Sequence, residues 1–216
     1  MSKLNKEMSD IPDIAEWSNG IEIILKREAE TSQSYFWLHN TASRNAAANN
    51  DYIQIPAIIL QTITGFLAAT TGLVPPLALG AFSILTGIMS TILSYYRFSA
   101  KSEGHRIVAE LYLKIFKEIE IQLNLPPEQR TSPSKLLVDI KDKLDHIGEI
   151  SPTIPDNVIA KYKNEFKNTK SAKPIITNGL DEISIYKEEA FVAPTPHVDA
   201  KPDIKITFSS PVGSPK

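Results

Sequence analysis

Two histidines, His39 and His105, are the residues of this sequence whose type and placement most suggest site chemistry. Neither belongs to a nucleophile motif, a glycine-rich phosphate loop or a metal-ligand cluster, and the chain has no cysteine. An imidazole pair could bind a metal ion or respond to pH, but such residues also serve as polar packing groups or caps. We therefore expect no enzyme, no catalytic residue, no cofactor and no metal site, and keep the two histidines as a candidate pair.

The histidines flank a run of 45 residues, 52–96, that contains no Asp, Glu, Lys, Arg or His. Pro75-Pro76 breaks this run near its middle, because proline lacks a backbone N–H and disfavours helix in the residue before it. Each half could form a helix about 30 Å long, which matches the hydrocarbon core of a bilayer. The sequence therefore predicts membrane spans at 52–72 and 76–96; a buried helix pair in a soluble protein is the alternative.

Amphipathic helices are expected around the two spans. Apolar residues recur at helical spacing within 21–51 and 97–124, and the second of these helices should continue from its span without a turn. Shorter helices are expected at 133–147 and 156–168. The predicted fold is an all-α membrane protein in which a two-span transmembrane helical hairpin extends into a cytosolic antiparallel helical stem, followed by short C-terminal helices.

The two ends of the chain are expected to lack stable structure. Residues 1–13 are polar and should form a flexible N-terminus. Residues 169–216 are rich in proline, with six between 173 and 216, and should form a disordered tail in which short binding motifs could lie. The folded domain is therefore predicted to occupy 14–168.

Laying the two spans antiparallel about residue 74 brings small and polar residues face to face. Small residues allow close helix approach in lipid and polar residues hydrogen-bond across. These rows either pack against each other within one chain or line a channel in an oligomer. The same register predicts ion pairs Asp51–Arg97 and Arg44–Glu103, and places His39 about one turn from His105. The hairpin or pore-face candidates are Gln54, Gln61, Gly65, Ala68, Gly72, Gly80, Ser83, Gly87, Ser90 and Ser94.

Charge indicates orientation and excludes one class of partner. The formal net charge is −2, which gives no support for nucleic-acid binding. Basic residues stand on the outer flank of both spans, among them Arg44 before the first and Arg97 and Lys101 after the second, whereas the linking loop has none. Because positive charge stays on the cytoplasmic side, both termini are expected in the cytoplasm.

Several short runs resemble the SLATT domain, the SMODS and SLOG-associating two-transmembrane effector domain. They include Ser-Gln-Ser-Tyr-Phe-Trp-Leu-His-Asn at 32–40, Ile-Pro-Ala-Ile-Ile-Leu-Gln-Thr-Ile-Thr-Gly at 55–65, His-Arg-Ile-Val-Ala at 105–109 and Ser-Pro-Thr-Ile-Pro at 151–155. Members of that family are predicted two-span membrane effectors, and bacterial ones are proposed to perforate membranes when a partner domain senses a nucleotide signal. The resemblance covers roughly Ile14 to Phe166, most of the chain, and implies an effector domain there.

Two functions follow as expectations. The first is an integral membrane effector that forms homo-oligomers in the lipid bilayer and opens a pore or perturbs the membrane. The alternative is a non-conducting scaffold that recruits a protein partner through its cytosolic helices or tail.

The orientation can be tested by glycosylation. An acceptor site on a flexible spacer, inserted in the loop at 72–76, should be modified when the chain is made in cells that glycosylate lumenal sites. An acceptor fused to either terminus should stay unmodified, and mass shift on a gel reports both. An unmodified loop beside a modified terminus would reverse the orientation.

Overall fold

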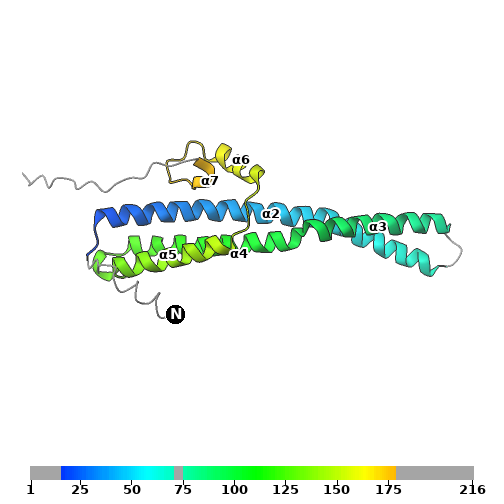
Figure 1. Cartoon of the computed structure of the whole chain (residues 1–216), viewed down its shortest axis with the longest axis horizontal. Helices are drawn as coiled ribbons and strands as arrows, with labels where there is room; N and C mark the ends of the chain where they lie inside the picture. Colours follow the sequence, from blue (N-terminus) through cyan, green and yellow to red (C-terminus); the bar gives the residue numbers. More distant parts are fainter. Residues whose placement is uncertain (1–15, 71–74, 179–216) are drawn as a thin grey trace, which may run out of the picture. The chain divides into compact units, whose positions relative to one another are not determined.

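The computed structural model describes residues 16–70 and 75–178, and every regular element in that part is a helix (Figure 1). The expected flexible segment 1–13, the candidate Gly72 and residues 179–216 of the expected tail lie outside the described residues. The elements are α2 Asn19–Ala69, α3 Pro76–Tyr96, α4 Phe98–Asn124, the 3₁₀ turn η2 Pro127–Gln129, α5 Pro133–Ile150, α6 Asp156–Glu165 and α7 Ile175–Asn178.

Helix α2 joins the predicted segments 21–51 and 52–72 into one helix of 51 residues. Ser18 caps its start, because the Ser18 hydroxyl accepts a hydrogen bond from the Ile21 N–H at 3.4 Å. Pro56 lies inside the helix without ending it. Two helices, α2 and the α3–α4 segment, are long and apolar enough to cross a membrane by length and composition.

Helix α3 does not run on into α4, contrary to the sequence expectation. Arg97 separates them with φ 49° and ψ 44°, the one positive φ at a non-glycine residue in the described chain. The Arg97 N–H still bonds the Leu93 carbonyl and the Lys101 N–H bonds the Arg97 carbonyl, each at 3.0 Å. These are the last hydrogen bond of α3 and the first of α4, and the left-handed residue between them breaks the helical phase.

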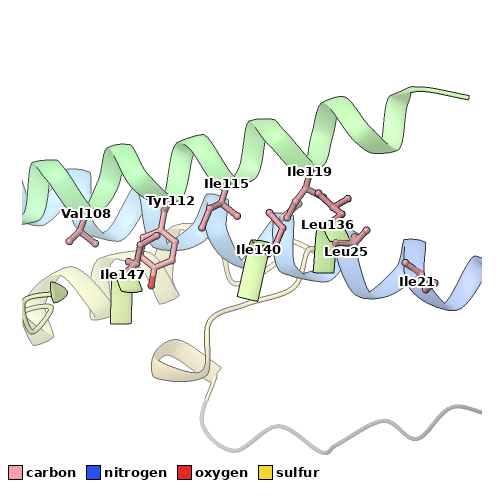
Figure 2. Packing of buried hydrophobic residues seen from close by; sticks show 10 residues of the cluster. Ile21, Leu25, Val108, Tyr112, Ile115, Ile119, Leu136, Ile140 and Ile147 are labelled. Carbon is pink, nitrogen blue, oxygen red and sulfur yellow. The ribbon is translucent and has the colours of Figure 1, made fainter. Parts of the chain in front are cut away.

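Helix α2 packs against both α3 and α4, and α5 covers α4. We call the paired part of α2 before residue 51 and α4 the stem, and the paired rest of α2 and α3 the hairpin. The stem holds the main hydrophobic cluster, to which α5 contributes a third side (Figure 2). Its buried members are Ile21, Leu25, Ala29, Val108, Tyr112, Ile115, Ile119, Leu136, Ile140 and Ile147.

An ion pair ties the two chain segments at one end of the stem. The Arg130 guanidinium bonds Glu22 at 2.5 Å and the Leu125 carbonyl at 2.7 Å, and lies 4.7 Å from the centre of the Trp17 ring. Its side chain is only 7% exposed, so the charge is held by these partners rather than by water. The start of α2 is therefore fastened to the end of α4.

A second, smaller cluster attaches α6 to the stem, and separate contacts lie beyond the predicted folded domain. Ile154, Val158 and Tyr162 pack with Leu38 and Ala42 of α2. Beyond them, the Ala172 N–H bonds the Glu30 carboxylate at 2.7 Å, and Pro174 and Thr177 are buried. The expectation of disorder from residue 169 was therefore wrong for 169–178, because these tertiary contacts have no signature in local composition.

The stem core should be sensitive to truncation at Ile119, which is 0% exposed. We expect Ile119→Ala to destabilise the detergent-solubilised chain by about 2–5 kcal/mol, through lost apolar burial and the cavity left behind. Ile121→Ala is the matched control on the same helix, since Ile121 is 59% exposed and should change stability by less than about 0.5 kcal/mol. Chemical denaturation followed by circular dichroism measures both, and equal losses would contradict this packing.

Candidate functional site

The predicted rows of small and polar residues lie on the outside of the hairpin. All nine that fall in the described chain are exposed: Gln54, Gln61, Gly65, Ala68, Gly80, Ser83, Gly87, Ser90 and Ser94. A methyl group added to Gly65, Gly80 or Gly87 would meet no atom within 4 Å. The interpretation that these rows pack against each other within one chain was therefore wrong; the interpretation that they face an assembly stays a prediction.

Larger side chains occupy the least exposed positions of the hairpin instead. On α2 these positions follow the face that the stem already uses, and on α3 they recur at spacings of three and four. Apolar groups of this size pack well in helix pairs without needing close backbone approach. The residues that are not fully exposed are Ile53, Ala57, Leu60, Thr64 and Leu67 on α2, with Ala78, Leu79, Phe82, Thr86, Met89, Ile92 and Leu93 on α3.

The hairpin's polar side chains fall into two groups with different needs. Thr62, Thr64, Thr86 and Thr91 each donate to the carbonyl four residues earlier, at 2.7–2.9 Å. By contrast, the Gln61 amide and the Ser83 and Ser90 hydroxyls make no hydrogen bond within the described chain. Gln54 accepts one from Asn50 at 2.7 Å. Gln61, near the middle of the apolar segment of α2, is therefore an exposed amide without a partner.

Tyrosines mark the stem-side end of the hairpin, a feature that the sequence interpretation missed. Tyr52 is 84% exposed, Tyr95 is 79% exposed and Tyr96 stacks on Phe98 with ring centres 5.2 Å apart. Tyrosine is enriched at membrane–water interfaces because its ring is apolar and its hydroxyl is polar. The position of these tyrosines at both ends of the charge-free run was the sequence signal that could have marked them as candidate interface residues.

Neither predicted boundary ion pair forms in the described chain. Glu103 pairs with Arg106 at 2.7 Å, and Arg106 also contacts Glu110, all on one exposed face of α4. Asp51 contacts only Asn50, at 3.4 Å. The reason is the stem register: α2 is shifted along α4 by about one helical turn relative to the predicted alignment. Arg44 and Glu103 therefore do not lie opposite each other.

Polar contacts set that register. The Ser43 hydroxyl donates to the Ser102 carbonyl at 2.9 Å, and the Ser102 hydroxyl donates to the Ser43 carbonyl at 3.0 Å. The two hydroxyl oxygens lie 3.3 Å apart. Since a slip of even one turn would separate all four groups, this reciprocal pair selects one alignment of α2 and α4.

The candidate histidines meet directly beside this serine pair. His39 and His105 are 1% and 4% exposed, and their Nδ1 atoms lie 2.9 Å apart. The other ring nitrogen of His39, Nε2, lies 3.3 Å from the Ser151 hydroxyl, in the connection from α5 to α6. We call His39, Ser43, Ser102, His105 and Ser151 the polar layer.

The surroundings of the polar layer favour neutral groups. Burial, and then the neighbouring His105, lowers the pKa of His39 to about 4. Burial also lowers the pKa of His105. Tyr35 and Tyr112 stack beside the layer with ring centres 4.9 Å apart, and burial followed by the neighbouring Tyr35 raises the pKa of Tyr112 to about 12. Near neutral pH the layer is therefore an uncharged hydrogen-bonded unit.

The polar layer brings two metal-ligating side chains together, His39 and His105. Among residues 16–70 and 75–178, no group of three His, Cys, Asp or Glu side chains is placed to hold a metal. The structural roles of Ser43, Ser102 and Ser151 had no signal in the sequence, because their contacts depend on register.

The chain matches no protein-family model, no curated protein and no solved structure.

The register can be tested by disulfide trapping in this cysteine-free chain. We expect Ser43→Cys with Ser102→Cys to form an intramolecular disulfide readily on mild oxidation, because the two side chains already touch. The control pair, Arg44→Cys with Glu103→Cys, follows the alignment predicted from sequence and should cross-link far more slowly. Mobility on a non-reducing gel and peptide mass mapping measure both. Faster trapping of the control pair would reject the observed register.

Proposed function

We propose that this chain is an integral membrane protein of the two-span effector type, which self-associates through the outward polar rows of its hairpin and so opens a pore or perturbs the bilayer. The unpartnered Gln61 amide on the exposed side of the hairpin carries this proposal. In hydrocarbon, an amide without a hydrogen-bond partner costs several kcal/mol, of order 4–8 on water-to-cyclohexane scales. A second copy of the chain, or water held between copies, would remove that cost.

The rest of the row supports the same interface. Ser83 and Ser90 are also exposed and unpartnered, and Gly65, Gly80 and Gly87 leave open space beside the backbone. Small residues with unsatisfied hydroxyls are the composition that allows close helix association in lipid. Because one hairpin buries none of these groups, the face is available to another hairpin.

The ends of the hairpin support its placement in a membrane. Tyr52 and Tyr95 are exposed at the stem side, where interfacial tyrosines are expected, and the apolar side chains between the ends are exposed as lipid contacts require. Arg44, Arg97 and Lys101 lie on the stem side and are exposed. These charges support a cytoplasmic stem with both described ends of the chain on that side.

The resemblance to the SLATT domain contributes the effector part of the proposal. That family is associated with predicted two-span membrane effectors, and the short runs at 32–40 and 105–109 that carry the resemblance are the segments that form the polar layer's surroundings. The trigger for such an effector would act on the stem, which in this proposal lies outside the bilayer.

Leakage of dye from proteoliposomes tests the proposal. We expect the wild-type chain to release dye in step with oligomer formation, and Gln61→Leu combined with Ser90→Leu to lower release at least about tenfold, because the polar face is then matched to lipid rather than to another copy. Cross-linking in the same vesicles should show loss of oligomers.

Thr91→Val is the matched control, since the Thr91 hydroxyl is already bonded to the Gly87 carbonyl of its own helix. It should insert, associate and leak as the wild type does. Unchanged leakage in the Gln61→Leu, Ser90→Leu variant would reject the polar rows as a pore face. Tight vesicles containing a stable wild-type monomer or dimer would support the non-conducting scaffold instead.

A further inference from the structure

We propose that the polar layer is an acid-sensitive contact that holds α2 and α4 of the stem together. Proton uptake by the His39–His105 pair separates these helices and releases Ser151, in the connection that leads to α6. The polar layer lies in the stem, and stem opening is measured separately from pore formation.

The geometry allows the pair to hold only one proton between its facing nitrogens. At 2.9 Å, one Nδ1 must donate and the other must accept. If His105 donates, His39 carries its proton on Nε2 and donates to the Ser151 hydroxyl; if His39 donates, its Nε2 accepts from that hydroxyl. In either neutral arrangement, both ring nitrogens of His39 and the Nδ1 of His105 are hydrogen-bonded. Two imidazolium rings would place two N–H groups against each other, so the closed layer excludes the doubly protonated state.

Within the part of the chain that the structure describes, no charged side chain bonds the rings of the layer. The rings face Tyr35 from α2 and Tyr112 from α4, both with a raised pKa and therefore neutral. The flanking charges of α4, Glu103 and Arg106, pair with each other at the surface. From α5, the buried Ile147 packs in the main hydrophobic cluster, which includes Tyr112. A proton added here is thus both desolvated and without a counter-ion.

The charged groups of the remaining elements are also occupied or exposed. From α6, Tyr162 bonds Ser34 at 2.8 Å and Lys161 lies over the Trp37 ring. At the end of α5, His146 and Glu149 are exposed. From the connection to α6, Ser151 reaches the layer with a neutral hydroxyl. Among residues 16–70 and 75–178, no carboxylate bonds either ring. Acidification therefore acts on this layer by protonating an imidazole, whereas in a buried ion pair it would neutralise the acid.

The sign of the pH effect follows from the proton count. The closed layer lowers the pKa of His39 to about 4, whereas an opened, hydrated histidine has a pKa near 6.5. Between these values the open state binds more protons, so stability of the closed layer is complete above about pH 6.5 and falls as pH decreases towards 4. The protonation of His39 alone raises the equilibrium constant for opening at pH 5 about 30-fold over its value at neutral pH.

Opening has defined consequences in the structure. The reciprocal Ser43–Ser102 hydrogen bonds lie beside the rings, and Ser151 begins the segment whose Ile154 packs in the second cluster. Separation of the rings would therefore loosen both the stem register and the attachment of α6. Because α2 is one continuous helix from the stem to Ala69, movement of its stem part would also move its hairpin part.

Hydrogen exchange on the full chain in lipid nanodiscs tests this inference. We expect exchange in peptides covering 35–43, 102–112 and 151–162, corrected for intrinsic rate, to increase about 30-fold or more between pH 7.5 and pH 5. His39→Asn with His105→Asn should abolish that increase while keeping polar side chains in the layer. His146→Asn is the matched control on an exposed histidine and should respond as the wild type does.

Two outcomes would overturn the inference: a wild-type chain without the pH response, or a double variant with the same response as wild type. If the double variant does not fold, ¹⁵N-histidine spectra of the wild-type chain decide. The inference expects two histidines that stay neutral well below pH 6.5 until the stem opens. Four histidines titrating near pH 6.5 without increased exchange would refute it.

Discussion

The alignment of α2 with α4 depends on the buried polar layer more than on any apolar contact. Isoleucine and leucine side chains pack in several registers at similar cost, but the Ser43–Ser102 bonds and the His39–His105 contact exist in one register only. Leaving such groups buried and unpaired would cost about 1–3 kcal/mol each. The apolar cluster therefore supplies much of the stability of the stem, and the polar layer selects a single register of α2 and α4.

This alignment reaches the hairpin differently along its two helices. Helix α2 is unbroken, so the face that packs in the stem continues through Ile53, Ala57 and Leu60. Helix α3 is separated from α4 by the left-handed Arg97. If α4 continued backwards without that residue, its packing face would include Ser94, Gly87 and Ser83. The phase change at Arg97 instead places larger apolar residues inside and directs the small and polar row outwards.

The outward row and the polar layer differ in how their polar groups are hydrogen-bonded. In the stem, every side chain of the polar layer has a partner within the chain. In the hairpin, the threonines bond their own helix, whereas Gln61 and Ser90 have no partner in the described chain. A hydrogen-bonded pair within one chain stabilises the monomer; an unpartnered group in lipid favours association. This difference is the basis of the proposal that a folded stem carries an associating hairpin.

Local sequence determined the helices of this protein, because a charge-free run with a central Pro75-Pro76 leaves hydrogen-bonded helices as the favourable structure in an apolar environment. Apolar spacing also identified the stripe around Val108 and Ile119 that the stem buries. Tertiary structure alone decided which faces meet. One residue of helical phase is about 100° of rotation, and the conformation of Arg97, the serine pair and the ordering of 169–178 all come from contacts between segments distant in sequence. For that reason the sequence placed His39 near His105 but assigned the wrong partners to Arg44, Asp51 and the polar rows.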